Sequence, residues 1–570
     1  MKKLLTLACA ACLALMAGAV PAKPGTHTVA QSDGSTLTLR MVGDEWHHSY
    51  VTTDGLSVAQ APDGNFYYRL AGGLTTMLAH NPSDRPASEQ TFVAQHAQNL
   101  TLQATRPAAA SQKAKRNDRR RRATQVPNNG SPRIPIILVN YTDVKMKSDD
   151  PVAAFTAQFK EGGKSCFQYF YDQSRGKFTP QFDIYGPINL SRERAYYGGN
   201  DYYGDDKGVG LMVAEACDSL KATVDFSPYD NDGDGEVDVV IVLYAGVGEA
   251  QAYRTVPNSV WPCQWELSDS EYGSKLQVGN KYIDKFAVFN ELYGANERTT
   301  RLDGIGTFCH EFSHCLGLPD FYDTDYLGNF GMGDWSLLDG GCYNDDGDTP
   351  IGYSAYERDF MGWITLETPV QNTTYTLDAL NTDTGKAYKI VNSLNPNEYY
   401  VLENRQRTGW DAYMAASGML ITHVDYDEYI WDINEVNNTA SHQRMTPIPA
   451  DGVLSTYSTS GDLWPYNGLD SLTNNSSPAA RVFTGTYMNQ PIHAITRTGN
   501  QISFTYMHAS YLRGDVNNDG EVDVNDVNIL INIVLGNDEA GKYGDRANVD
   551  GSGDVDVADV NTLINLILSE

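Results

Sequence analysis

The sequence is short of long apolar runs and of basic residues. Beyond residues 4–19, no stretch reaches the ~20 apolar residues that a membrane-spanning helix requires, so we expect no membrane span. Only 42 Lys and Arg stand against 72 Asp and Glu, which gives a formal net charge of −30. Because nucleic acids are bound through basic surfaces, this balance argues against a nucleic-acid partner.

Cysteine is scarce as well. Two of the eight cysteines lie in the apolar run at the N-terminus, and six remain, at positions 166, 217, 263, 309, 315 and 342. In an exported chain this even number permits disulfide bonds without fixing their pairing, and buried free thiols are an equal alternative. Cys309 and Cys315 are six residues apart on an expected helix and point to different faces, so they should not pair with each other.

The N-terminus has the three parts of a secretory signal. Met1-Lys2-Lys3 is basic, residues 4–19 are apolar, and Val20-Pro21-Ala22 forms the small-residue end. We expect residues 1–22 to be a signal peptide that is removed after Ala22. The product would be secreted, either extracellular or at the cell surface.

Residues 23–122 have the character of a propeptide with a basic processing linker. Short alternating patterns at residues 50–58 and 65–70 predict hairpins. From 108 to 130 large apolar residues are few, and residues 119–122 are four consecutive arginines, so this stretch is expected to be exposed and extended. Ahead of a catalytic domain in an exported chain, such a linker suggests a processing site, with an ordinary solvated charge run as the alternative.

At 570 residues the chain is too long for one hydrophobic core, so several domains are expected. Buried-strand patterns at residues 134–141 and 237–246, with helix-like spacing of phenylalanines over 153–174, predict an α+β domain covering residues 123–366. From 367 to 508 only strand-like segments and turns follow, which predicts a β-rich, sandwich-like domain.

The segment His310-Glu311-Phe312-Ser313-His314 is the strongest functional signal in the chain. Two histidines four residues apart on a helix point from one face, as a catalytic zinc site requires. Glu311 is then placed to take a proton from a water molecule that the metal acidifies. The helix is expected over residues 307–316, with Gly317 ending it. The plain alternative is a pair of satisfied histidines on an ordinary helix.

The third metal ligand is open between two carboxylates. Asp320 falls where the metzincin spacing places its last ligand, and a carboxylate is an acceptable zinc ligand. Glu357, on a later expected helix, is the alternative that a gluzincin-type site would use. We favour Asp320, whose plain alternative is a turn carboxylate; for Glu357 the plain alternative is a solvated helix residue.

Three segments around these residues, 310–323, 333–338 and 353–357, resemble the immune inhibitor A family of secreted zinc metalloproteases. With weaker matches the resemblance extends over roughly residues 45–508. It implies a zincin-type catalytic domain, a zinc cofactor, a propeptide that makes the precursor a zymogen, and hydrolysis of peptide bonds in protein substrates. Family members often carry Met after Trp-x-x, in a turn beneath the metal. This chain has Leu337-Leu338 there, and Leu can fill such an apolar floor.

The C-terminal residues 509–570 contain an internal repeat, in which residues 523–532 recur 33 positions later. Each unit carries oxygen-bearing residues at positions 1, 3, 5, 7, 9 and 12 of a calcium loop, followed by one helix. The expected ligands of the first loop are Asp515, Asn517, Asp519, Glu521 through its carbonyl, Asp523 and Asp526. Those of the second loop are Asn548, Asp550, Ser552, Asp554 through its carbonyl, Asp556 and Asp559.

A calcium loop with Asp at its last position and no preceding helix resembles the dockerin module, which implies a cohesin-like partner for residues 514–570. The residues before the last ligand, Val524-Asn525 and Val557-Ala558, differ from the common Ser-Thr pair. Surface attachment or a calcium-stabilised cap therefore stays open.

A further candidate calcium site lies upstream, in an Asp/Asn/Gly run. Its residues follow the loop positions 1, 3, 5 and 9 and are Asp230, Asp232, Asp234 and Asp238. A plain acidic turn is the alternative.

The leading hypothesis is a secreted zinc endopeptidase, made as a zymogen, with zinc and calcium as its cofactors. A tyrosine or histidine would stabilise the oxyanion, and the candidates are Tyr322, Tyr343, Tyr356 and His423. The alternative is a non-catalytic, scaffold-associated calcium-dependent binding protein on a degenerate zincin fold. The intact His310, Glu311 and His314 argue against that alternative, because the base would then serve no purpose.

Overall fold

The computed structural model describes residues 18–44, 48–70, 73–100, 126–160, 162–200, 206–252, 255–455, 459–507, 513–550, 552 and 554–569. The chain divides into two compact units, one of Met1–Trp363 with Asp427–Gln443 and one of Ile364–Tyr426 with Arg444–Glu570. The expected signal segment up to residue 17 and the arginine run at residues 119–122 lie outside the described residues.

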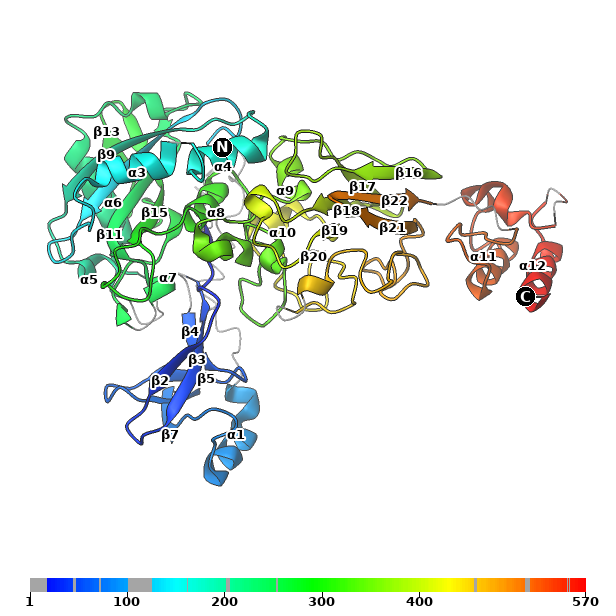
Figure 1. Cartoon of the computed structure of the whole chain (residues 1–570), viewed down its shortest axis with the longest axis horizontal. Helices are drawn as coiled ribbons and strands as arrows, with labels where there is room; N and C mark the ends of the chain where they lie inside the picture. Colours follow the sequence, from blue (N-terminus) through cyan, green and yellow to red (C-terminus); the bar gives the residue numbers. More distant parts are fainter. Residues whose placement is uncertain are drawn as a thin grey trace, which may run out of the picture. The chain divides into compact units, whose positions relative to one another are not determined.

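The N-terminal part of the first unit is a six-stranded antiparallel sheet with a helix packed on it (Figure 1). Each strand pairs with its sequence neighbour; they are β2 (His27–Ala30), β3 (Thr36–Gly43), β4 (His48–Thr52), β5 (Ser57–Gln60), β6 (Phe66–Leu70) and β7 (Gly73–Leu78). Their core includes Leu39, Val58 and Phe66, with Leu100 from helix α1 (Ala87–Leu100). The hairpins predicted from the alternating patterns are present here.

A six-stranded mixed sheet lies at the centre of the rest of the first unit, in the order β1–β12–β15–β11–β8–β9. The parallel strands are β8 (Arg133–Asn140), β9 (Gln181–Asn189), β11 (Val240–Val247) and β15 (Lys285–Leu292). Strands β12 (Cys263–Glu266) and β1 (Gly18–Ala19) extend the sheet in antiparallel fashion. β11 is buried at every position because both faces of the parallel sheet are covered.

The helices of this part are α3 (Pro151–Lys160), α4 (Cys166–Ser174), α5 (Arg194–Tyr197), α6 (Val209–Leu220), α7 (Glu249–Ala252), α8 (Gly306–Cys315) and α9 (Ala355–Phe360). A small sheet joins β10 (Glu236–Val237), β14 (Lys281–Ile283) and β13 (Leu276–Val278). The stretch 153–174, which the phenylalanine spacing predicts as helical, forms two helices. Ser165 caps the second by accepting a hydrogen bond from the backbone N–H of Gln168. The mixture of helices and strands agrees with the α+β class.

The second unit contains two antiparallel sheets that share one hydrophobic core. One joins β16 (Thr373–Leu377), β22 (Gln501–Tyr506) and β21 (Ile492–Thr498). The other joins β17 (Ala387–Asn392), β18 (Asn395–Arg405), β19 (Gly418–Asp425) and β20 (Met445–Pro447). Leu377, Leu402, Ile421 and Phe504 belong to this core, an arrangement of the sandwich kind.

Residues Asp427–Gln443, between β19 and β20, depart from the expected continuous β-rich domain. They contain helix α10 (Glu428–Asp432) and cluster with the first unit. The ring of Trp431 lies 6.5 Å from that of Phe321 and 6.3 Å from that of Tyr356, between ring centroids. Apolar packing thus holds residues Asp427–Gln443, called the excursion below, against the rest of the first unit, which no local sequence pattern indicates.

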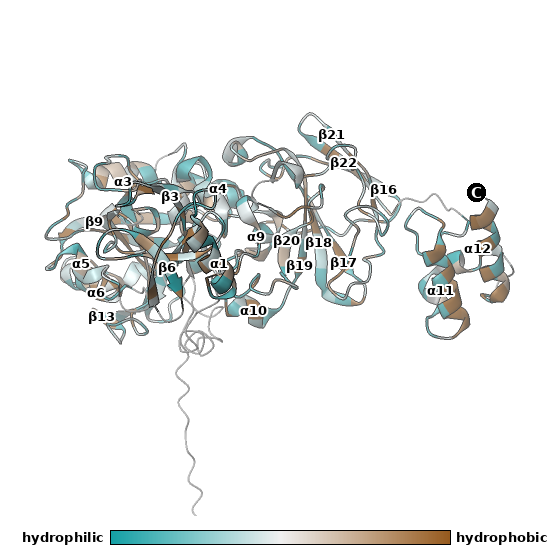
Figure 2. Ribbon diagram, turned by 90° about the horizontal axis from the view of Figure 1, so that it is seen from below, coloured by the Kyte–Doolittle hydropathy of each residue, from teal (hydrophilic) through white to brown (hydrophobic). Residues whose placement is uncertain are grey.

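The C-terminal module has one helix after each repeat loop, α11 (Val524–Val534) and α12 (Val557–Ser569). Figure 2 shows apolar residues along both helices. Val527 and Leu530 from α11 share a core with Val560 and Leu563 from α12, each the counterpart of the other 33 positions apart. The packing of two like units, predicted from the repeat, is present.

All six cysteines outside the N-terminal run are buried and form no disulfide bond, so Cys309 and Cys315 do not pair with each other, as expected. Within the part of the chain that the structure describes, no helix has the length and apolarity needed to cross a membrane.

Candidate metal centre

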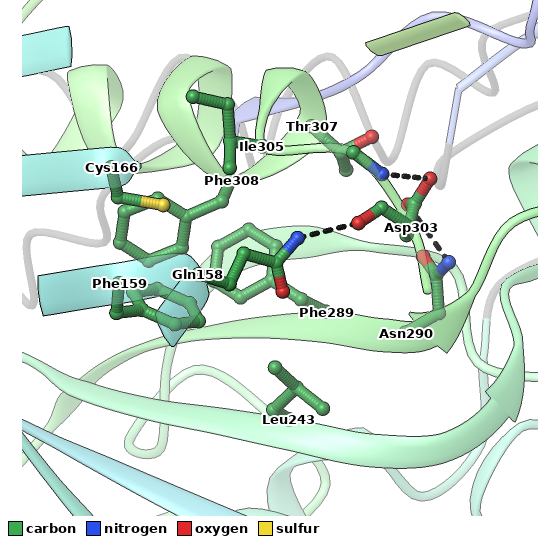
Figure 3. Close-up of a pocket in the computed structure, with 11 residues that line it drawn as sticks. Gln158, Phe159, Cys166, Leu243, Phe289, Asn290, Asp303, Ile305, Thr307 and Phe308 are labelled. Carbon is green, nitrogen blue, oxygen red and sulfur yellow. Dashed lines mark hydrogen bonds between the residues drawn. The ribbon is translucent and has the colours of Figure 1, made fainter. Parts of the chain in front are cut away.

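Helix α8 carries the predicted site. It begins close to Asp303, a buried aspartate whose carboxylate and carbonyl oxygens accept hydrogen bonds. The carboxylate of Asp303 accepts hydrogen bonds from Asn290 Nδ2 at 2.9 Å and from the Gly304 N–H at 3.0 Å, and Gln158 Nε2 donates to its carbonyl (Figure 3). Burial raises the pKa of Asp303 to about 6. At the first residue of the helix, a Cβ on Gly306 would lie 1.9 Å from the carbonyl oxygen of Cys342, so only glycine fits.

His310 and His314 lie one turn apart on α8, and both are buried. His310 Nδ1 is 2.7 Å from the carbonyl oxygen of Leu337, and His314 Nδ1 is 2.8 Å from that of Leu318. A carbonyl can only accept, so each Nδ1 carries the proton and each Nε2 of the neutral ring keeps its lone pair. The two Nε2 atoms are 3.1 Å apart.

Asp320 completes this cluster. Gly317, with a φ of 105°, ends the helix and turns the chain, so that Asp320 Oδ1 lies 3.1 Å from His310 Nε2 and 3.2 Å from His314 Nε2. Three lone-pair atoms this close, all buried, would repel one another without a cation among them. Two imidazoles and one carboxylate fit a divalent metal of the zinc type.

The protonation states suit metal binding. Burial lowers the pKa of His314 and keeps its ring neutral, as a metal ligand must be. Burial opposes ionisation of the Asp320 carboxyl, but the charge and hydrogen bonds of the two imidazoles, when these rings carry a second proton, outweigh burial and lower the pKa of the carboxyl well below the usual range. A bound divalent cation would supply positive charge in place of those protons, so that Asp320 would stay ionised beside unprotonated Nε2 atoms.

Glu311 lies beside the ligands with no exposed surface. Its Oε1 accepts a hydrogen bond of 2.5 Å from the backbone N–H of Val20, and its Oε2 is buried without a hydrogen-bond partner. Burial, with the nearby charge of Asp320, raises the pKa of Glu311 well above its ordinary value. A carboxyl in this setting can hold a proton and pass it on.

Glu357 is not part of the metal cluster among the described residues. It is the third residue of helix α9, where it forms a capping box with Ser354. Its Oε1 also accepts a hydrogen bond of 2.6 Å from the hydroxyl of Ser336. Of the two carboxylates considered from the sequence, the structure brings Asp320 to the histidines and gives Glu357 a capping role.

The floor of the site is apolar. Leu337 and Leu338 are fully buried, and the carbonyl of Leu337 holds His310. The Leu338 carbonyl accepts the N–H of Phe321, the residue after Asp320. The turn that has Leu337 and Leu338 where family members often have methionine thus supports His310 directly and Asp320 through its neighbour.

Two features of the site escape the sequence patterns. Asn434, from the excursion, bonds to Asp320, and nothing in the local sequence around Asn434 indicates that contact. The second is the segment around Val20, which the sequence assigns to the signal peptide. In the structure the Val20 carbonyl accepts a hydrogen bond of 3.1 Å from Trp261 Nε1, and Tyr343 Oη donates to the Pro21 carbonyl at 2.6 Å. Of the four oxyanion candidates, Tyr343 is therefore bonded to the chain segment in the site, whereas His423 bonds to Glu398 at 2.9 Å.

The first repeat loop folds around its carboxylates. Asp515 accepts the N–H of Gly520, Asp519 accepts that of Glu521, and Asp523 caps α11. Asp526 accepts the N–H of Asn517 at 3.0 Å and is fully buried. Burial raises the pKa of Asp515 to about 6 and that of Asp526 to about 7, and repulsion from neighbouring carboxylates adds to the effect of burial.

The second loop repeats the pattern more loosely. Asp559 is buried and accepts the N–H groups of Asp550 and Asp556 at 3.0 and 2.8 Å. Ser552 donates to the Asp554 carbonyl at 3.3 Å, and Asn548 Oδ1 is buried without a hydrogen-bond partner. An unpaired inward oxygen at the first loop position fits a bound cation.

The upstream acidic run brings together Asp230, Asp232 and Asp238, but not Asp234. Asp234 instead accepts the N–H of Glu236 at 2.8 Å. Lys281 Nζ forms an ion pair with Asp230 and so competes with any cation there.

Comparison with known proteins finds two family matches in the chain. Residues 141–364 match the family described as immune inhibitor A peptidase M6, catalytic domain, and residues 513–568 match the dockerin type I domain. The chain is 29% identical over 219 residues to Immune inhibitor A of Bacillus thuringiensis subsp. alesti, covering 34% of this chain and 31% of that protein. It is 25% identical over 229 residues to the Pre-pro-metalloprotease PrtV of Vibrio cholerae serotype O1, covering 36% and 24%. The resemblance seen in the sequence is confirmed, although the chain spans less than a third of either relative.

Proposed function

We propose that this chain, which carries a catalytic domain of the immune inhibitor A peptidase M6 kind, is a secreted zinc endopeptidase made as an inactive precursor. The observation that carries the proposal is the convergence of His310, His314 and Asp320 beside the buried Glu311. Peptide bonds in protein substrates are the proposed target.

Zinc, when bound by these residues, would acidify a water molecule and polarise the substrate carbonyl. Glu311 would take the proton from that water and later give it to the leaving amine. The raised pKa of Glu311 suits this role, because the buried carboxyl keeps its proton until an amine presents itself. The 2.5 Å bond from the Val20 N–H to Glu311 supports the assignment, since it marks where a leaving nitrogen would lie.

The segment around Val20 also supports a substrate path. Gly18 and Ala19 pair antiparallel with Gln264 and Cys263 of the edge strand β12. An extended substrate would add to the same edge by main-chain hydrogen bonds. Tyr343, which bonds to the Pro21 carbonyl, is the proposed group that holds the substrate backbone on the leaving side.

The same contacts support latency. While Val20 occupies Glu311, no substrate can use that base. Loss of Val20 would lift this restraint, and release of the rest of the N-terminal part by cleavage in the arginine linker at residues 119–122 would complete activation.

Casein digestion by the processed chain, with and without o-phenanthroline, tests the activity. We expect the chelator to abolish it and Glu311→Gln to lower it about 10²- to 10⁴-fold while zinc stays bound. Glu428→Gln, at an exposed glutamate on α10, should leave it unchanged. A processed chain that binds zinc, cleaves nothing and is indifferent to Glu311→Gln would leave the non-catalytic binding protein as the function.

For the tail we propose calcium binding in both loops and attachment to a cohesin-like or surface partner. Three pairs of exposed apolar side chains, 33 positions apart, support a protein partner: Val524 and Val557, Ile531 and Ile564, Leu535 and Leu568. Calorimetry with cohesins, in calcium, would compare the wild type with the double variant Leu535→Lys, Leu568→Lys. Binding by neither chain would favour a calcium-stabilised cap.

A further inference from the structure

Asn434 lies in the excursion from the β-rich part of the chain, two residues after helix α10. Its side chain is buried, and its backbone has a φ of 57°, in the left-handed region that asparagine tolerates better than most residues. The excursion belongs to the same compact unit as the metal centre. A polar side chain buried in that unit must find its hydrogen bonds there.

Asn434 satisfies both ends of its amide on a single residue. The backbone N–H of Asp320 donates to Asn434 Oδ1 at 2.7 Å, and Asn434 Nδ2 donates to Asp320 Oδ2 at 2.6 Å. The amide therefore grips both the backbone and the carboxylate of Asp320. Oδ2 is engaged, and Oδ1 is the oxygen that faces the two imidazoles.

We propose that Asn434 is a positioning residue for the metal centre, which holds the Asp320 carboxylate so that Oδ1 alone is offered to the metal. This inference rests on the proposed zinc site. The physical reason is that a carboxylate free to rotate offers either oxygen or both, and hydrogen bonding of its second oxygen fixes one geometry. Residues that orient a ligand in this way contribute about 10- to 100-fold to metal affinity.

The excursion contains a matched control for this residue. Asn438 makes the same two-ended contact with Thr324 that Asn434 makes with Asp320: it accepts the Thr324 N–H at 3.0 Å and donates to Thr324 Oγ1 at 2.9 Å. Both contacts join residues 114 apart. Asn438 thus tethers the same excursion without touching a metal ligand.

The test measures zinc affinity in the full chain by competition with a chelating dye, in a Glu311→Gln background that prevents self-cleavage. Asn434→Asp keeps the size of the side chain and the acceptor for the Asp320 N–H but replaces the donor with a second carboxylate. Asn434→Gly removes the side chain and keeps the left-handed backbone free of strain. We expect both to weaken zinc binding about 10- to 100-fold, and Asn438→Asp to leave it unchanged.

Cobalt(II) in place of zinc gives a readout that a merely structural role would not move. Release of Asp320 Oδ2 should raise the coordination number in Asn434→Gly and weaken the visible absorption of the bound cobalt. Wild-type affinity and spectrum in both Asn434 variants would overturn the inference, as would an equal loss in Asn438→Asp. A parent chain that binds no zinc at all would instead overturn the proposed function.

Discussion

At the scale of single residues, the metal centre depends on which atom of each side chain is left without a partner. His310 and His314 each engage Nδ1 with a backbone carbonyl, and Asp320 engages Oδ2 with Asn434. The atoms that remain, two Nε2 and one Oδ1, face one another. The hydrogen bonds of the two Nδ1 atoms and of Oδ2 therefore decide which atoms are left to bind a metal.

Asp320 and Glu357 are the two candidates for the third metal ligand, and their removal should affect different properties. Asp320→Ala removes a ligand atom, so we expect the zinc content of the purified chain to fall to background. Glu357→Ala removes the capping box and the bond to Ser336, which should lower the free energy of unfolding by about 1–3 kcal/mol and leave zinc bound. Metal analysis with urea unfolding of the two variants separates the roles; loss of zinc in Glu357→Ala alone would reverse them.

Spacing alone could predict His310, Glu311 and His314, because the helical repeat places the two histidines on one face and Glu311 is the neighbour of one of them in the sequence. It could not decide between Asp320 and Glu357, since each follows a pattern that real metal sites use. The decision depends on where the chain turns after Gly317 and on a partner 114 residues away. Such long-range contacts leave no periodic signal in the sequence.

A buried ion network in the second unit offers a stability test at the same scale. Arg405 is fully buried, and its guanidinium donates to Asp411 at 2.7 and 3.1 Å and to Glu403 at 3.0 Å. Asp411→Ala leaves a buried charge half paired, so the free energy of unfolding should fall by about 3–5 kcal/mol. The exposed pair Lys386 and Glu367, at 2.7 Å, is the control, and Glu367→Ala should cost less than about 1 kcal/mol. Equal losses in urea unfolding would contradict the burial argument.

At the scale of elements, the sheet of the catalytic part ends in a strand that the sequence assigns to a signal peptide. Strand β1 continues the sheet beyond β12. Downstream of it the Ala22 N–H donates to the Gly43 carbonyl and the Lys23 N–H to that of Ala250. The composition of a short terminal segment can indicate a signal for export. It does not indicate with which strand, or in which register, the segment pairs, so the pairing of β1 with β12 could not be predicted.

The N-terminal end of the exported chain should therefore control latency. Cleavage after Ala22 would remove Val20, whereas cleavage after Ala19, which also follows small residues, would keep it. We expect a chain prepared to start at Val20 to hydrolyse casein far more slowly than one that starts at Lys23. A chain that starts at Gly18 is the control and should stay latent. Equal rates from all three would show that the contact with Glu311 does not restrain the enzyme.

Two further elements differ from what the sequence predicts, and each has an identifiable cause. The phenylalanine-rich stretch forms α3 and α4 because Ser165 starts a new helix. The excursion with α10 leaves the β-rich part because Trp431 finds aromatic neighbours in the catalytic part. The buried strands β8 and β11 and the two tail helices were predictable, since each carries its own hydrophobic pattern.

At the scale of the whole molecule, the excess of acidic residues has a structural use in the C-terminal module. The formal charge of −30 includes carboxylates that the two repeat loops bury or hold close together. Burial raises the pKa of Asp526 to about 7, so the folded module without calcium holds a proton that the unfolded chain releases near pH 4. The stability that this proton contributes is full below that pH and is lost as pH rises through about 7.

Calcium should therefore matter more at pH 8 than at pH 5. In a chelator, we expect hydrogen exchange in α11 and α12 to be faster at pH 8, after correction for the intrinsic pH dependence of exchange. With calcium at 100 times its Kd, each occupied loop should gain about 2.7 kcal/mol, and the difference between the two pH values should shrink. Asp526→Asn removes the titrating group, so its module should lose the pH dependence in chelator. Exchange in α8 reports the other compact unit and should not follow calcium in the tail. A chelator effect of equal size at both pH values would contradict the link between burial of Asp526 and calcium.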